Sequence, residues 1–228
     1  MEQQRRLRAF VSWSGGKDAA LSYFRAREDF QITHLLNMVA EDGVVSRSHG
    51  LRTNVLRMQA DAMNLTMIQP RSTWETYENE FKRAVTALGA SQIEAGIFGD
   101  IDLEGHREWV ERVCTDLGIS VALPLWHAKR EDIMREFIDA GFEAVVVATK
   151  KDVMGLEWLG RRIDDEFIRD MAHLEGVDLA GENGEYHTLV LSGPGFGRSI
   201  RIVNFEKIIV DQHCFLDITD CELVDAGA

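Results

Sequence analysis

The chain has 228 residues, of which 45% are hydrophobic, so it can bury a substantial core without disulfides or bound metal. Its formal net charge of -13 disfavours general nucleic-acid binding, because the net field repels phosphodiester backbones. One large domain or two tightly joined lobes both fit this length. No Ser-, Gly- or Pro-rich stretch indicates a flexible linker between them.

The cysteines and the start of the chain bear on the compartment. The three cysteines show neither CxxC nor zinc-type spacing, which predicts a reducing compartment and no disulfide framework. We expect Cys114, Cys214 and Cys221 to be packing residues. The arginine-rich residues 1–8 precede an apolar run that is far too short for a signal segment or a membrane span. These features predict a cytoplasmic protein that contacts no membrane.

The first half alternates strand and helix patterns. An apolar run over 7–11 stops at Ser14-Gly15-Gly16, and apolar residues then recur at helical spacing. Further strands are expected at 32–40, 66–69, 93–98 and 119–123, and helices at 55–65, 74–88 and 106–117. Buried strands without alternation indicate a parallel sheet with helices on both faces, whose ligands lie at the strand carboxyl ends.

From residue 124 onward the pattern is looser. It predicts helices over 131–140 and 163–174, a strand over 144–148, and three later strands over 189–191, 200–210 and 215–224. The second half is therefore expected to form a smaller α+β lobe. We place the boundary between the two parts at residues 125 and 126.

The strongest local motif is Ser14-Gly15-Gly16-Lys17-Asp18, between a predicted strand and a predicted helix. Glycines let the backbone approach a phosphate closely, and the N–H groups that begin the helix point at the anion. Lys17 adds a positive charge that we expect to be mobile. An ordinary glycine turn with a solvated lysine is the alternative interpretation.

The spacing around this motif excludes a Walker A loop, which needs Gly, four residues and then Gly-Lys-Ser/Thr. The motif instead resembles the PP-loop, SGGKDS, of ATP pyrophosphatases, which hold the β,γ-pyrophosphate of ATP and cleave between its α and β phosphates. Ala19 stands where that motif has its final serine, so one hydroxyl contact to phosphate is missing.

A second motif is Gly181-Glu182-Asn183-Gly184-Glu185-Tyr186-His187-Thr188, which we call the octapeptide. Its two glycines allow a bend that would bring Glu182 and Glu185 together as a hard-oxygen pair, suited to Mg²⁺ or to an amine. By composition alone, a polar hairpin turn is an equally good interpretation.

The octapeptide resembles the GE-x-GE-[FY]-x-T segment of the diphthine–ammonia ligase family. The stretch that begins Phe98-Gly99-Asp100-Ile101 and closes with Pro124-Leu125-Trp126 resembles the central block of that family. The PP-loop falls at the family's N-terminal position. The resemblance therefore spans residues 13 to about 210 in matching order.

This resemblance implies a HUP-type Rossmann-like ATP pyrophosphatase domain over 1–125 and a family-specific substrate-binding lobe over 126–228. It implies an ATP-dependent amide-forming ligase that adenylates the diphthine carboxylate of translation elongation factor two for attack by ammonia. AMP and pyrophosphate are the implied products. ATP and Mg²⁺ are the implied cofactors, with ammonia and the elongation factor as partners.

Site residues follow from the matching motifs. Those expected at the nucleotide are Ser12, Ser14, Gly15, Gly16, Lys17 and Asp18. Those expected at the substrate are Glu182, Glu185, His187 and Thr188. Lys17, Glu182 and Glu185 are the expected catalytic residues.

Asp100, at a strand end, is expected to contact Mg²⁺ or the nucleotide, and capping of the helix that begins near Leu103 is an equal alternative. His49 lies in a polar loop near the expected cleft, where it either contacts ligand or is solvated. His106 and His127 are interpreted as structural. The stripe of Trp109, Val110 and Val113 has the spacing of a buried helix face.

Two other functions are less consistent with the sequence. A PP-loop enzyme that acts on tRNA generally relies on cysteine sulfur carriage and a basic surface, and this chain has neither a CxxC pair nor positive charge. A HUP-fold sensor that binds ATP or AMP without turnover needs no carboxylate cluster, so the octapeptide argues against it. The sequence does not specify the acceptor carboxylate, the ammonia source or the oligomeric state.

Overall fold

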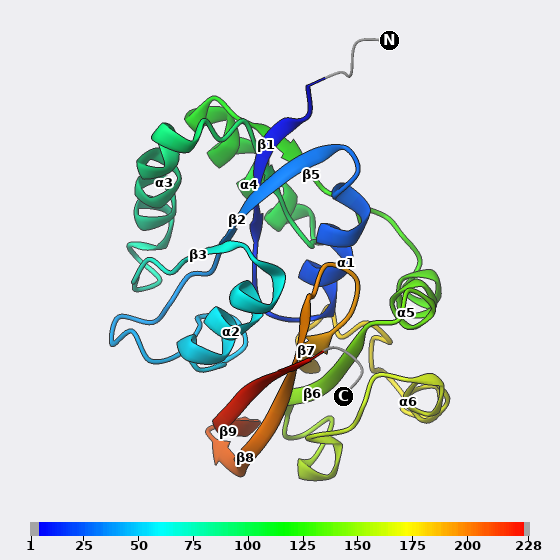
Figure 1. Cartoon of the computed structure of the whole chain (residues 1–228). Helices are drawn as coiled ribbons and strands as arrows, with labels where there is room; N and C mark the ends of the chain where they lie inside the picture. Colours follow the sequence, from blue (N-terminus) through cyan, green and yellow to red (C-terminus); the bar gives the residue numbers. More distant parts are fainter. Residues whose placement is uncertain (1–4, 226–228) are drawn as a thin grey trace.

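The structure, a computed structural model, describes residues 5–225, apart from the side chains of residues 90 and 91. Its strands form two sheets (Figure 1). Five parallel strands in the order β3-β2-β1-β4-β5 form the first sheet. Four antiparallel strands in the order β7-β6-β9-β8 form the second. The predicted α/β fold with a smaller C-terminal α+β part is confirmed.

The elements alternate as expected in the first half. The parallel sheet consists of β1 (Leu7–Ser12), β2 (Phe30–Leu36), β3 (Thr66–Ile68), β4 (Ala95–Ile97) and β5 (Ser120–Ala122). The helices between these strands are α1 (Lys17–Ala26), α2 (Thr53–Met63), α3 (Tyr77–Ala87), η1 (Leu88–Ser91) and α4 (Glu104–Leu117). The second half contains α5 (Arg130–Asp139), β6 (Glu143–Lys150), η2 (Leu156–Trp158), α6 (Asp165–Met171), β7 (Tyr186–Ser192), β8 (Arg198–Val210) and β9 (His213–Asp225). The predicted boundary at residues 125 and 126 falls between β5 and α5.

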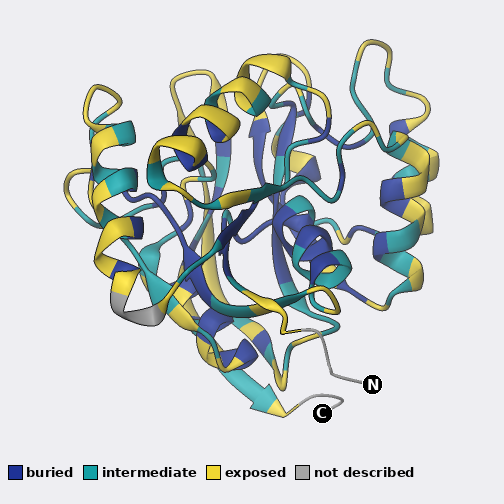
Figure 2. Cartoon of the chain, turned by 90° about the horizontal axis from the view of Figure 1, so that it is seen from above, coloured by how far each residue is buried: buried dark blue, intermediate teal, exposed yellow. Residues whose placement is uncertain are grey.

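The side chains of β1 alternate between two cores, as the period of a strand requires. Phe10 packs edge-on against Phe81 of α3 and Phe98, with ring centroids 5.9 and 6.0 Å apart. Ala9 and Val11 face the opposite side, in a core that continues into the second sheet. Figure 2 shows the central strands buried and the outer helix faces exposed. Both faces of the parallel sheet are therefore covered.

The second half packs against α1 and against the turn that precedes it. The N–H of Val190 in β7 donates to the carbonyl oxygen of Gly15 at 2.9 Å. Arg25 of α1 pairs with Glu136 of α5. A C-terminal strand is thereby fixed beside the loop that follows β1.

Several helices and strands are shorter in the structure than predicted, because local interactions end or begin them. The strand expected to reach residue 40 ends at Leu36, after which the side chain of Asn37 donates to the Trp13 carbonyl at 2.8 Å. The helix expected from residue 74 begins at Tyr77, because Thr73 and Thr76 exchange N–H and hydroxyl bonds in a turn. The helix expected over 163–174 covers Asp165–Met171, since the Asp164 carboxylate caps its start.

The structure also bears on the predictions about the cysteines and about membrane-spanning segments. All three cysteines are free and buried, as expected of packing residues. No helix within residues 5–225 is both long and apolar enough to cross a bilayer. Residues 1–4 of the arginine-rich start lie outside the described residues.

Candidate functional site

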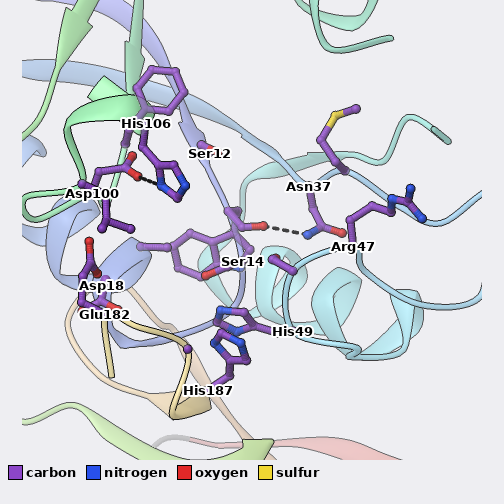
Figure 3. A pocket seen from close by; sticks show the side chains of 18 of the residues that line it. Ser12, Ser14, Asp18, Asn37, Arg47, His49, Asp100, His106, Glu182 and His187 are labelled. Carbon is purple, nitrogen blue, oxygen red and sulfur yellow. Dashed lines mark hydrogen bonds and ion pairs between the residues drawn. The ribbon is translucent and has the colours of Figure 1, made fainter. Parts of the chain in front are cut away.

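A cavity of about 480 Å³ lies at the carboxyl end of the parallel sheet (Figure 3). Its size is typical of small-molecule sites, and this edge is where open α/β sheets bind ligands. Most of the predicted site residues line it, namely Ser12, Ser14, Lys17, Asp18, His49, Asp100, Glu182, His187 and Thr188. The structure thus brings the PP-loop motif and the octapeptide to one cavity.

The two PP-loop glycines are buried in the turn and do not line this cavity. A Cβ atom on Gly16 would lie 2.6 Å from Cε1 of His49 and 3.1 Å from the carbonyl oxygen of Thr188. Gly15 has φ +87°, and a Cβ there would lie 2.4 Å from Leu56. The glycines are therefore required by close packing within the protein as well as by the turn.

Gln59 of α2 holds this turn in place. Its side-chain oxygen accepts from the indole N–H of Trp13 at 2.8 Å. Its amide nitrogen donates to the carbonyl oxygens of Gly15 at 2.9 Å and Val190 at 2.7 Å. Because Gln59 is fully buried and these bonds engage both ends of its amide, the loop is fixed between α2 and β7.

The amine of Lys17 is fixed, contrary to the expectation of a mobile charge. Lys17 is 3% exposed, and its Nζ donates to the Asp18 carboxylate at 2.9 Å and to the carbonyl oxygen of Ala180. Nζ also lies 5.1 Å from the centroid of the Tyr186 ring. A buried ammonium requires such partners, since it has lost its hydration. The positive charge is therefore held at one wall of the cavity.

The two octapeptide carboxylates do not converge. Glu182 lines the cavity and accepts from the N–H of Ile101 at 3.2 Å. Glu185 is 4% exposed and accepts from the N–H groups of Asp178 at 2.9 Å and Asn183 at 3.1 Å. The side-chain amide of Asn183 also donates to it, at 3.2 Å. Glu185 therefore organises the turn and is not on the cavity, because three donors draw it inward.

Glu182 has an unusual environment for a carboxylate. Burial raises its pKa to about 7, and the nearby Asp18 and Asp100 carboxylates add to this, while the Ile101 N–H opposes it. A carboxyl group with a pKa near neutrality, in a cavity, has the properties of a general acid or base.

Metal binding was expected at Asp100. Within the described residues, no group of three or more His, Cys, Asp and Glu side chains could hold a metal by itself. Oδ1 of Asp18 is buried without a hydrogen-bond partner, and Asp100 lines the same cavity. Mg²⁺ commonly binds through one or two carboxylates together with substrate phosphates, so these carboxylates fit a metal that arrives with a nucleotide.

His49 and His187 stack in the cavity with ring centroids 4.3 Å apart and planes 22° apart (Figure 3). Burial lowers the pKa of His187 to about 4 and that of His49 well below its ordinary value, and Lys17 contributes to both shifts. Nδ1 of His49 lies 3.3 Å from the Thr188 carbonyl oxygen. Because a carbonyl only accepts, Nδ1 carries the proton, and Nε2 is left as an acceptor.

Models of two families match the chain. The model of the diphthamide synthase N-terminal domain matches residues 7–121, and that of the diphthamide synthase C-terminal domain matches residues 129–224. The chain belongs to the diphthamide synthase family.

Curated relatives agree with this family membership. The diphthine–ammonia ligase of Rattus norvegicus is 26% identical over 232 aligned positions, which cover 90% of this chain and 86% of the relative. The Homo sapiens protein of the same name is 29% identical over 132 positions, covering 56% of this chain and 49% of the relative. A solved structure titled as a predicted subunit of tRNA methyltransferase from Methanocaldococcus jannaschii has 13% identity and a TM-score of 0.44, covering 82% of this chain and 98% of that one. That overlap is too limited to bear on function.

Two histidines and a helix stripe interpreted as structural can now be placed in this diphthamide synthase family member. Nδ1 of His106 lies 2.9 Å from Oδ1 of Asp100, and both line the cavity (Figure 3). Asp100 does not cap α4, whose preceding residue is Leu103 without a side-chain capping bond. Trp109 is half-buried and lines the cavity with Val110, so only part of the stripe is purely core. His127 lies outside the cavity, as expected for a structural residue.

Several cavity residues of this family member were not predicted from the sequence, among them an amide, a guanidinium and two aromatic side chains. Asn37, Arg47, Trp74 and Tyr77 come from the segments that follow β2 and β3. The sequence feature that could have indicated them is the presence of an arginine and a tryptophan in two polar loops, each of which follows the carboxyl end of a strand. Neither loop contains a motif that would single them out.

Proposed function

We propose that this chain is an ATP-dependent, amide-forming ligase that adenylates a carboxylate for attack by ammonia and releases AMP and pyrophosphate. The proposed acceptor is diphthine on elongation factor two, or a related carboxylate. The observation that carries this proposal is the bond from the Lys17 N–H to the Thr188 hydroxyl, at 3.0 Å. It joins the PP-loop to the octapeptide at a single cavity, and relatives across most of the chain are named diphthine–ammonia ligases.

The cavity residues fit a nucleotide tail. The N–H of Gly16 donates to the Ser14 hydroxyl at 3.3 Å, and that of Lys17 donates to the Thr188 hydroxyl. Each N–H has an oxygen acceptor in this structure, so a phosphate at this helix start would meet the Ser14 and Thr188 hydroxyls and the Lys17 amine, all of which belong to residues that line the cavity. Thr188 also supplies a hydroxyl near the helix start, where Ala19 lacks one.

The carboxylates Asp18 and Asp100 would hold Mg²⁺ together with phosphate oxygens, since Oδ1 of Asp18 has no partner among the described residues. When bound, the metal supplies charge neutralisation at the departing pyrophosphate.

The proposed first step is displacement at phosphorus. An oxygen of the acceptor carboxylate bonds to the α-phosphorus of ATP, and the bond from that phosphorus to the bridging oxygen of the β-phosphate breaks. Pyrophosphate leaves with that electron pair. Lys17 is pre-positioned to stabilise the growing negative charge, because its amine is already fixed and needs no rearrangement.

The proposed second step forms the amide. The nitrogen of ammonia bonds to the carbonyl carbon, and AMP leaves with the electrons of the acyl–oxygen bond. The nitrogen must then lose a proton, and ionised Glu182 is proposed to accept it, since its pKa of about 7 suits this task near neutral pH.

The test is product analysis with the proposed acceptor. Purified protein is incubated with ATP, Mg²⁺, an ammonium salt and elongation factor two that bears diphthine. The proposal predicts AMP, pyrophosphate and amidated factor in equal amounts, each dependent on the acceptor. Nucleotide binding without AMP or pyrophosphate would identify a sensor instead. AMP formation only with a different acceptor would retain the ligase chemistry and reject diphthine.

A further inference from the structure

One cation in the cavity has no role in the steps above. The guanidinium of Arg47 lines the cavity and lies 4.4 Å from the ring centroid of Trp74. Trp74 also stacks against Tyr77, with centroids 5.9 Å apart and planes 22° apart. Trp74 is 71% exposed, and it lines the cavity together with Arg47 and Tyr77.

Among the described residues, the guanidinium of Arg47 has neither a hydrogen bond nor an ion pair, and its Nε is buried without a partner. Several other partly buried arginines are paired, although Arg8, which does not line the cavity, also has a buried Nε without a partner in the described part of the chain. Arg52 makes two bonds of 2.7 Å to Asp217, and Arg130 binds Asp178 at 2.9 Å. A buried donor without an acceptor is unfavourable. The guanidinium of Arg47 can therefore still donate hydrogen bonds to a ligand.

The acidic side chains and the guanidinium that line the cavity lie on different sides of it. Asp18, Asp100 and Glu182 lie together on one side in Figure 3, and Arg47 lies on the opposite side. Lys17 is the other lysine or arginine that lines the cavity, and its amine is already occupied by Asp18 and by a carbonyl oxygen. An anionic group that enters on the Arg47 side therefore meets a cation without a competing carboxylate partner.

We propose that Arg47 is an anion-binding residue, which receives an anionic oxygen group of a ligand in this cavity through its guanidinium fork. The planar fork matches the oxygens of phosphate and carboxylate alike. The group is either a phosphate of the nucleotide or the carboxylate of the acceptor. This inference deepens the proposed function and rests on it.

Three substitutions separate charge, geometry and non-specific effects. Arg47→Met keeps an unbranched chain against Trp74 and removes the charge, whereas Arg47→Lys keeps the charge and removes the fork. Arg83→Met is the matched control, because the Arg83 side chain is 77% exposed on α3 and pairs, within residues 5–225, with Glu80 of its own helix. Each variant is first checked by circular dichroism and thermal melting.

The first measurement is calorimetric binding of ATP, AMP and adenosine. If Arg47 binds a nucleotide phosphate, Arg47→Met weakens AMP and ATP about tenfold or more and leaves adenosine unchanged. Arg47→Lys recovers part of the loss, and Arg83→Met has no effect. If Arg47 only holds its loop in place, Arg47→Met and Trp74→Leu weaken adenosine and AMP by the same factor, which overturns the inference.

The second measurement is steady-state kinetics with diphthine-bearing elongation factor two. If Arg47 binds the acceptor carboxylate, Arg47→Met raises KM for the factor about tenfold or more while nucleotide affinities stay unchanged. Unchanged AMP-to-adenosine selectivity together with an unchanged KM overturns the inference. Wild-type protein that binds nucleotide but forms no AMP refutes the proposed function instead, and the AMP-to-adenosine selectivity of Arg47→Met then decides the role of Arg47 alone.

Discussion

The main-chain N–H of Lys17 donates to the hydroxyl of Thr188 at 3.0 Å, although the two residues are 171 positions apart. Lys17 begins α1, and Thr188 lies in β7 of the other sheet. Two positions along, the N–H of Val190 donates to the Gly15 carbonyl oxygen at 2.9 Å. The geometry of the proposed phosphate-binding loop is therefore set by both halves of the chain.

Replacing Thr188 with valine tests this connection. Valine keeps the shape and removes the acceptor, so a buried N–H loses its partner, which destabilises the protein by roughly 1–3 kcal/mol. We expect a lower free energy of unfolding in urea and weaker ATP binding. Thr188→Ser retains the hydroxyl and serves as the control. Equal stability and affinity of Thr188→Val and wild type would show that the bond is unimportant.

Gly16→Ala tests the tight packing of the loop. The added methyl group would meet the His49 ring and the Thr188 carbonyl oxygen, and overpacking of this kind typically destabilises by about 1–3 kcal/mol. We expect lost ATP binding and a lower melting temperature. Gly105→Ala is the control, because that helical glycine faces open space and alanine there is favourable by roughly 0.5–1 kcal/mol. Similar melting temperatures for the two variants would contradict the packing argument.

The position of this loop could be predicted because its determinants are local. Strand, glycines and helix follow one another within a few residues around Ser14, and parallel sheets bind ligands at that edge. The direction of Glu185 could not be predicted, since it depends on donors from Asp178 and Asn183. Composition alone left a converging carboxylate pair and a hairpin turn equally open.

The Arg47 and Trp74 contact illustrates a second limit. The residues belong to two loops that follow different strands, and they meet only because β2 and β3 are neighbours in the sheet. No residue spacing in the sequence predicts that contact. The same applies to His49 and His187, whose stacking joins a loop of the first half to β7.

Glu182→Gln tests the proposed base. The raised pKa of about 7 predicts that, at a fixed concentration of neutral ammonia, the rate of amide formation rises with pH up to about 7 and then levels off, as the carboxyl group ionises. The variant should lose that pH dependence and about 10²–10⁴-fold in rate, since general-base contributions are of this size. A pH–rate profile of amide formation measures both. A variant with a wild-type profile would remove Glu182 from the mechanism.

The same carboxyl group has a consequence for stability. Its folded pKa is raised from 4.5 to about 7, so the folded state binds a proton that the unfolded state releases. Its contribution to stability is therefore lost as pH rises from about 4.5 to 7. The free energy of urea unfolding at pH 5 minus that at pH 7.5 should be lower for Glu182→Gln than for wild type. An unchanged difference would argue that the pKa of this carboxyl group is not raised in the folded state.

His187→Gln should change the pH dependence of stability at acidic pH. The folded pKa of His187 is lowered from 6.5 to about 4, so the unfolded state takes up a proton first and stability falls as pH drops from about 6.5 to 4. Removing the imidazole should lessen that fall by on the order of 1–2 kcal/mol, allowing for the open cavity. Melting temperatures at pH 7 and pH 5 provide the measurement. Equal falls for variant and wild type would contradict burial of a neutral ring.

The most direct test of the central claim is a structure of the protein with Mg²⁺ and α,β-methylene ATP, which resists cleavage between the α and β phosphates. We expect the β- and γ-phosphates at the start of α1, beside Ser14, Lys17 and Thr188, with Asp18 or Asp100 on the metal. A triphosphate bound elsewhere in the protein, with the Ser14-Gly15-Gly16-Lys17 turn empty, would contradict it.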